Sequence, residues 1–190
     1  MTDASTQQSM KGMLLVATPA LREPTFAQTV VALLEHSPAD GAIGVVLNRP
    51  TEASVAVAVP AVAEIVTAPP VLFEGGPVSP STAIALGLAV PGAEPEGWMP
   101  VVLPIVTVDL DHDAALLAAT LHDLRVFAGY AGWSAGQLER EIAEGSWYLV
   151  DGLPSDPFAE APEQLRTAVL RRQGWPLSVA AHAPLDPTVN

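Results

Sequence analysis

Residues 124–150, LRVFAGYAGWSAGQLEREIAEGSWYLV, carry the densest set of structural signals in the chain. Residues 124–130 predict a strand and residues 131–136 a tight, glycine-containing turn. Residues 137–144 predict a short helix, because Leu138 and Ile142 are four apart and share one helix face. Gly145 suits a helix end, and residues 146–150 are aromatic and β-branched, as strands are. We therefore expect a strand–turn–helix–strand unit against which other elements pack.

Ser134, in the turn of this unit, supports two incompatible interpretations. Gly132-Trp133-Ser134-Ala135-Gly136 fits G-x-S-x-G, the strand-to-helix turn that presents a serine nucleophile, and the order Ser134, Asp151, His182 fits a catalytic triad. Alternatively, Ser134 and Gln137 form a capping box, in which the hydroxyl accepts from the Gln137 amide and the Gln137 side chain reaches back. We favour the capping interpretation, since the motif fixes only three positions in a chain with 14 glycines.

Composition limits the class of protein. The chain has 190 residues, of which 49% are hydrophobic, and this suits a single domain with a substantial core. We find no apolar run long enough for a membrane span and no basic segment followed by an apolar one at the N-terminus. With no cysteine, disulfides, iron–sulfur clusters and thiolate zinc sites are excluded. We expect a cytoplasmic protein with no membrane association.

The charge distribution bears on partners. A net charge of −13 opposes broad attachment to nucleic acid, whose phosphates need clustered lysine and arginine. Arg166, Arg171 and Arg172 form the one local basic cluster, and they carry the alternative of weak nucleic-acid binding. We instead expect a protein or small-molecule partner.

The remaining chain predicts further strands and helices. Residues 13–17, 29–35, 42–47, 71–74 and 82–88 read as strands, and residues 101–108 as an edge or bent strand interrupted by Pro104. The short turn at residues 37–41 predicts an antiparallel hairpin, which argues against a purely parallel sheet. Asp109 or Asp111 is expected to cap a helix reaching about His122, and residues 162–173 predict the final helix. We expect residues 1–11 to be disordered, residues 12–175 to form the domain, and residues 176–190 to be an extended, proline-rich tail.

Several segments together resemble the YqgE/AlgH family. They are Leu14-Leu15-Val16-Ala17-Thr18-Pro19, Glu35-His36, Gly44-Val45-Val46-Leu47-Asn48-Arg49-Pro50, Gly75-Gly76-Pro77-Val78, and Gly129-Tyr130-Ala131-Gly132-Trp133-Ser134-Ala135-Gly136-Gln137-Leu138-Glu139. The resemblance spans residues 12–175 in order. It implies a single α/β (α+β) domain with a mixed, largely antiparallel, bent or bifurcated sheet that forms a pseudo-barrel and is flanked by helices.

The resemblance implies no defined biochemical activity. One branch of the family is named for a regulatory role in alginate production, and DNA binding has been supposed for it. Ser134 and Ala135 stand where the family has glycine and proline, and this departure argues against a nucleophilic serine. The resemblance therefore favours a non-enzymatic regulatory or interaction protein, with a transcription-related role as one form of it and the serine hydrolase as the alternative.

Other polar clusters have simpler explanations. No pair among His36, His112, His122 and His182 has zinc-protease spacing, and Asp109, Asp111 and Asp113 lack the glycine and distal glutamate of a calcium loop. We expect no metal and no cofactor. Arg49 either binds an anionic ligand or pairs with Glu35 or Glu74, and we favour the ion pair. We predict one ligand or partner patch, formed by Asn48, Arg49, Gly75, Gly76, Trp133 and Gln137.

Overall fold

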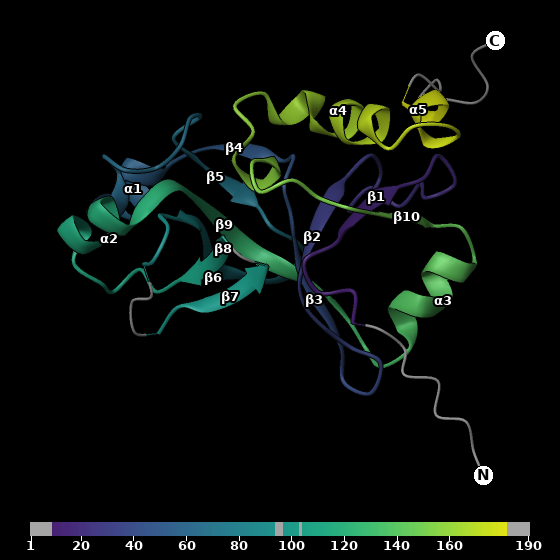
Figure 1. Ribbon diagram of the computed structural model, residues 1–190, viewed down its shortest axis with the longest axis horizontal. Helices are drawn as coiled ribbons and strands as arrows, with labels where there is room; N and C mark the ends of the chain where they lie inside the picture. Colours follow the sequence, from purple (N-terminus) through teal and green to yellow (C-terminus); the bar gives the residue numbers. More distant parts are fainter. Residues whose placement is uncertain (1–8, 94–96, 103, 182–190) are drawn as a thin grey trace.

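The computed structural model describes residues 9–93, 97–102 and 104–181, and within them a single large sheet dominates (Figure 1). Hydrogen-bonded neighbours follow the order β10-β1-β2-β3-β9-β6-β8-β7, and β4 and β5 branch from β9. The strands are β1 (Leu14–Ala17), β2 (Val30–Ser37), β3 (Gly41–Val46), β4 (Pro50–Ser54), β5 (Val71–Glu74), β6 (Val78–Ala89), β7 (Met99–Val102), β8 (Ile105–Val108), β9 (Leu121–Trp133) and β10 (Trp147–Val150).

Strand β9 is the element at which the sheet divides. It pairs with β6 along one edge, from Leu121 to Tyr130. On its other edge it pairs with β3, where Ala42 lies opposite Trp133, and with β5, where Phe73 lies opposite Phe127. The β5–β9 pair is parallel and the other described pairs are antiparallel. The expected bifurcated, largely antiparallel sheet is confirmed, but the sheet ends at β10 and β7 and does not close into a barrel.

Both faces of the β1–β2 region are buried, which explains why these strands are continuous apolar runs. Leu14 and Val16 belong to one core cluster, whereas Leu15 and Ala17 belong to another, because successive side chains of a strand point to opposite faces. A third cluster fills the far end of the molecule between β6, β8 and β9 and helices α1 and α2.

The helices cover these faces. They are α1 (Val55–Ala58), η1 (Pro60–Val62), α2 (Ala114–Thr120), α3 (Gln137–Ala143), η2 (Asp156–Phe158), η3 (Pro162–Gln164), α4 (Leu165–Arg172) and α5 (Leu177–Ala180). Helix α4 packs Leu165, Val169 and Leu170 on the Leu14–Val16 face, and α3 packs Leu138 on the opposite face (Figure 1). No helix within the described ranges is both long and apolar enough to span a membrane.

Four expected boundaries differ in the structure. The predicted turn at residues 131–136 begins later, because β3 pairs with β9 as far as Trp133. Residues 101–108 are two antiparallel strands, β7 and β8, on either side of Pro104. Asp113, not Asp109 or Asp111, caps α2, since its carboxylate accepts the Ala115 amide. Residues 177–180 of the expected extended tail form α5, whose Leu177 and Ala180 pack on the core.

Arg125 is buried in the middle of the fold, with 1% of its surface exposed. Its guanidinium donates to the carbonyls of Ala68, Pro157 and Ala159 and lies 4.3 Å from the centre of the Phe73 ring. Burial lowers the pKa of Arg125 to about 10, against the opposing effect of Asp123, so the group stays charged at neutral pH. The carbonyl dipoles and the ring therefore compensate a buried charge and join β9 to two loops.

Candidate functional site

Ser134 follows the last residue of β9 and is exposed. Its hydroxyl donates to Gln137 Oε1 at 3.1 Å, and its backbone N–H donates to the same oxygen at 3.0 Å. Gln137 thus reaches back as expected, but the Ser134 hydroxyl does not accept from the Gln137 amide. That amide bonds to the Ser134 carbonyl instead, because Gly136, at φ 69°, is the residue that caps α3.

The structure does not bring Asp151, the acid of the supposed triad, to Ser134. Asp151 directly follows Val150, at the end of β10 that is remote from α3. It lines a cavity whose lining does not include Ser134. Four residues of strand extend about 13 Å, which is far beyond hydrogen-bond reach. His182 lies outside the described residues.

Trp133 and Gln137, two members of the predicted patch, bind one carboxylate. Trp133 Nε1 and Trp147 Nε1 both donate to Glu141 Oε2 at 2.9 Å, and Gln137 Nε2 donates to Glu141 Oε1 at 2.9 Å. Phe26 packs against both indoles, with ring centroids 6.2 and 5.7 Å away. Glu141, which accepts from Trp133 of β9 and Trp147 of β10, therefore fixes α3 to both strands.

Asn48 and Arg49 hold the loop formed by residues 18–29, which links β1 to β2. Asn48 accepts the Val30 amide and donates to the Gln28 carbonyl. Arg49 Nη2 donates to the carbonyls of Pro24 at 2.6 Å and Ala27 at 3.4 Å. The ion pair that we favoured for Arg49 is therefore wrong: the loop carbonyls are its partners, and the bond between residues 49 and 74 runs from the Glu74 amide to the Arg49 carbonyl.

Gly75 and Gly76 are buried against the backbone of β9. A Cβ on Gly75 would lie 2.3 Å from the Gly129 carbonyl oxygen, and one on Gly76 would lie 2.3 Å from the Tyr130 carbonyl carbon. These glycines allow one chain segment to approach another. The six residues of the predicted patch thus join neighbouring segments, and of these six only Trp133 lines the open groove described next.

A groove of about 530 Å³ lies over the β2–β3 hairpin and the end of β9. Its lining residues are Glu35, His36, Ser37, Asp40, Gly41, Ala42, Ile43, Val78, Tyr130, Gly132 and Trp133. Ile43 and Val78 are 40% and 38% exposed. The floor is apolar, whereas Glu35 and Asp40 add carboxylates at its rim.

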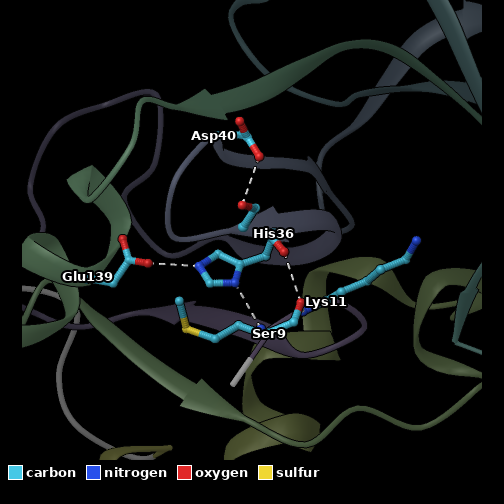
Figure 2. A network of polar contacts seen from close by, with 7 residues as sticks. Ser9, Lys11, His36, Asp40 and Glu139 are labelled. Atoms are coloured by element: carbon cyan, nitrogen blue, oxygen red, sulfur yellow. Dashed lines mark hydrogen bonds and ion pairs between the residues drawn. The ribbon is translucent and has the colours of Figure 1, made fainter. Parts of the chain in front are cut away.

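His36, in the wall of this groove, is the centre of a polar network (Figure 2). Its side chain is 1% exposed; Nε2 lies 2.9 Å from Glu139 Oε1, and Nδ1 accepts the Met10 amide at 3.0 Å. Because Nδ1 accepts a hydrogen bond, the proton is on Nε2 and points to Glu139. Neither nitrogen is available to act as a base toward a ligand.

The same network holds part of the segment that we expected to be disordered. Ser9 donates to the His36 carbonyl, and Lys11 pairs with Glu35 at 2.6 Å. Residues 9–11 are therefore fixed on β2, whereas residues 1–8 lie outside the described residues. Glu35-His36 stands out in the sequence, but its partner Glu139 does not, because 103 positions separate His36 from Glu139.

A second cavity, of about 490 Å³, lies between the ends of the divided sheet. Apolar residues of β1, β2, β6, β7 and β8 contribute about half of its lining, and Lys11 and Asp151 lie among its polar residues. Lys11 already pairs with Glu35, so the polar edge of this cavity is linked to the His36 network.

The basic cluster at residues 166–172 is largely occupied within the fold. Arg166 is 8% exposed and donates to the Ala17 carbonyl, and burial lowers its pKa despite the nearby Tyr148. Arg172 forms a bidentate pair with Asp156. The alternative of weak nucleic-acid binding thus loses Arg166 as a surface contact.

Within the described parts of the chain, no group of three acidic or histidine side chains is arranged to hold a metal ion. The Asp109 carboxylate accepts the Asp111 amide, and Asp113 caps α2. Local turn and cap geometry accounts for both bonds.

The divided sheet, together with the contacts among the family-like segments, defines a mixed α+β protein. A family model described as AlgH-like matches residues 14–178, and the chain belongs to this family. It is 47% identical over 195 residues to a UPF0301 protein of Streptomyces avermitilis, covering 100% of this chain and 98% of that protein. A UPF0301 protein of Thermobifida fusca is 44% identical over 190 residues, or 96% of each chain.

Solved structures agree with this assignment. The crystal structure of a Corynebacterium diphtheriae protein matches with a TM-score of 0.85 and 31% identity over 90% of each chain. The solution structure of the AlgH protein from Pseudomonas aeruginosa matches with a TM-score of 0.70 and 28% identity, covering 96% of this chain and 97% of that one. The family suspected from the motifs is confirmed.

Proposed function

We propose that this protein is a non-enzymatic, cytoplasmic interaction protein with a regulatory role, and that the groove over Ile43 and Gly132 is its binding surface. One observation carries the proposal: the polar side chains of the family-like segments bind other parts of the chain, whereas the groove leaves apolar side chains exposed. Exposed apolar patches rimmed by polar residues mark interaction sites.

The contacts of Ser134 support this function over the hydrolase. A nucleophilic serine needs an adjacent base, and the partner of the Ser134 hydroxyl is an amide oxygen. A fluorophosphonate probe tests the alternative directly. We expect no labelling that depends on Ser134, so wild type and Ser134→Ala should give the same signal; labelling abolished by Ser134→Ala would reject our proposal.

Photo-crosslinking tests the binding surface. A benzoylphenylalanine placed at Ile43 should give a discrete adduct in cells, and mass spectrometry should identify the crosslinked partner. The same probe at Val57, which is 83% exposed and lies outside the groove, is the matched control. Equal adducts from both positions, or none from position 43, would contradict the proposal.

A further inference from the structure

Gly132 differs from the other glycines near the end of β9. Gly75, Gly76 and Gly129 are required by packing, since a Cβ on each would lie 2.3 to 2.6 Å from a backbone atom. At Gly41 the added Cβ would lie 2.1 Å from the Trp133 carbonyl oxygen. Those four positions therefore accept no side chain without movement of the backbone.

Gly132 is required neither by packing nor by its backbone conformation. It is exposed, it is not among the glycines of positive φ, and an added Cβ would have Tyr130 Cε2 at 3.7 Å and Val78 Cγ2 at 3.9 Å as its nearest neighbours. Both distances are ordinary van der Waals contacts. A glycine inside a strand weakens it, and where the fold does not need one, it often marks a place where a ligand or another chain approaches closely.

The position of Gly132 suits such an approach. It lies opposite Ile43 in the β3–β9 pair, and both residues line the groove. The absent side chain leaves a gap in the apolar floor between Ile43, Val78 and Tyr130. A single bulky apolar side chain of a partner could occupy this gap.

The rim determines the charge of that partner. Glu35 and Asp40 line the groove, and 56% of the Glu35 side chain is exposed. Glu35 pairs with Lys11 at the surface and Asp40 accepts from Ser37. Exposed ion pairs contribute little to stability, so a cation from outside can replace Lys11. The net charge of −13 adds a long-range attraction for a basic partner.

We propose that the groove binds a short, extended segment of another protein, with one bulky apolar side chain over Gly132 and a neighbouring lysine or arginine facing Glu35 and Asp40. This inference rests on the proposed function, whose surface it shares, and specifies the partner. It explains why the strand keeps a glycine that its own packing does not require.

Peptide selection tests the inference. A phage library of random dodecapeptides is selected on the full-length protein, and the enriched peptides are synthesised and titrated by fluorescence anisotropy. We expect them to combine a large apolar residue with lysine or arginine. Gly132→Leu should weaken their binding by about tenfold or more, as for a blocked interface centre, although the net charge is unchanged. Ala53→Leu, which adds the same side chain at an exposed position on β4, should bind like wild type.

The charge of the rim is tested separately. Glu35→Gln combined with Asp40→Asn should weaken binding severalfold and reduce its salt dependence, whereas Glu52→Gln, at an exposed position of β4, should not. Failure to enrich peptides, enriched peptides without basic residues, or equal affinity for Gly132→Leu would overturn the inference. A dimer that Gly132→Leu abolishes in analytical ultracentrifugation would also overturn it, by identifying a second copy as the occupant. If crosslinks form at position 43 while the peptide test fails, the proposed function stands and only the partner chemistry is rejected.

Discussion

Trp133 and Trp147 meet edge to face, with ring centroids 6.2 Å apart, and donate their indole N–H groups to the same carboxylate oxygen. The acceptor is Glu141 of α3, so one side chain joins the ends of β9 and β10 to the helix between them. Because both indoles are buried, their shared hydrogen-bond acceptor holds together the unit formed by residues 121–150.

Removal of the shared acceptor should therefore destabilise this unit. Glu141→Ala leaves two buried indole N–H groups without a partner, and we expect a loss of about 2–4 kcal/mol in the free energy of unfolding. Glu141→Gln retains an acceptor oxygen and should lose less. Urea unfolding followed by tryptophan fluorescence measures both, and equal midpoints for Glu141→Ala and wild type would contradict the role given to Glu141.

Ser134 and Gln137 should differ sharply when each is replaced by alanine. Ser134→Ala removes one exposed hydrogen bond and should change stability by less than about 0.5 kcal/mol. Gln137→Ala removes the acceptor of the Ser134 amide and a donor to Glu141, and should cost about 1–2 kcal/mol. Thermal unfolding of the two variants side by side gives the comparison; a larger loss for Ser134→Ala would reverse our assignment.

Two glycines should respond to alanine in opposite directions. Gly132→Ala adds a Cβ that meets Tyr130 and Val78 only at ordinary van der Waals distances, and it should raise stability by about 0.5–1 kcal/mol, since glycine is unfavourable in a strand. Gly75→Ala places its Cβ 2.3 Å from a carbonyl oxygen and should lower it by about 1–3 kcal/mol or more. Chemical denaturation provides the measurement. Destabilisation by Gly132→Ala would show that the strand itself needs this glycine.

Loss of His36 should release residues 9–11 from β2. His36→Leu removes the acceptor of the Met10 amide and the donor to Glu139, and a lost bond of this kind is worth about 1–3 kcal/mol. We expect hydrogen exchange at Met10 to accelerate by roughly 10- to 100-fold. Lys11→Ala breaks only the exposed pair with Glu35 and serves as control; equal acceleration in both variants would mean that His36 does not hold the segment.

Arg125 should be among the most sensitive positions in the chain. Arg125→Ala leaves a cavity beside Phe73 and deprives three carbonyls of their donor, so we expect a loss of about 3–5 kcal/mol. Arg125→Met fills more of the space and should lose less. Arg22→Ala, at an exposed position, should leave the unfolding midpoint unchanged. A similarly small effect of Arg125→Ala would contradict the bridging role.

Local sequence signals located most of the elements because they depend on neighbours in the chain. The apolar runs at residues 13–17 and 29–35 predicted strands, and the turn at residues 37–41 predicted the antiparallel β2–β3 pair that the structure contains. The four-residue spacing of Leu138 and Ile142 likewise predicted α3. The ordered series of motifs was enough to identify the family.

What the sequence alone determined is thus the order of most elements and the family, whereas the role of Gly75 and Gly76 as points of close approach came from the structure. Tertiary structure decided the partners: Glu141 for Trp133, Glu139 for His36, and the carbonyls of Pro24 and Ala27 for Arg49. It also showed that Gly132, unlike Gly75, Gly76 and Gly129, has room for a Cβ. The reason is physical: a periodic pattern reports which face of an element is buried, whereas a hydrogen-bond partner or a steric gap depends on segments that only folding brings together.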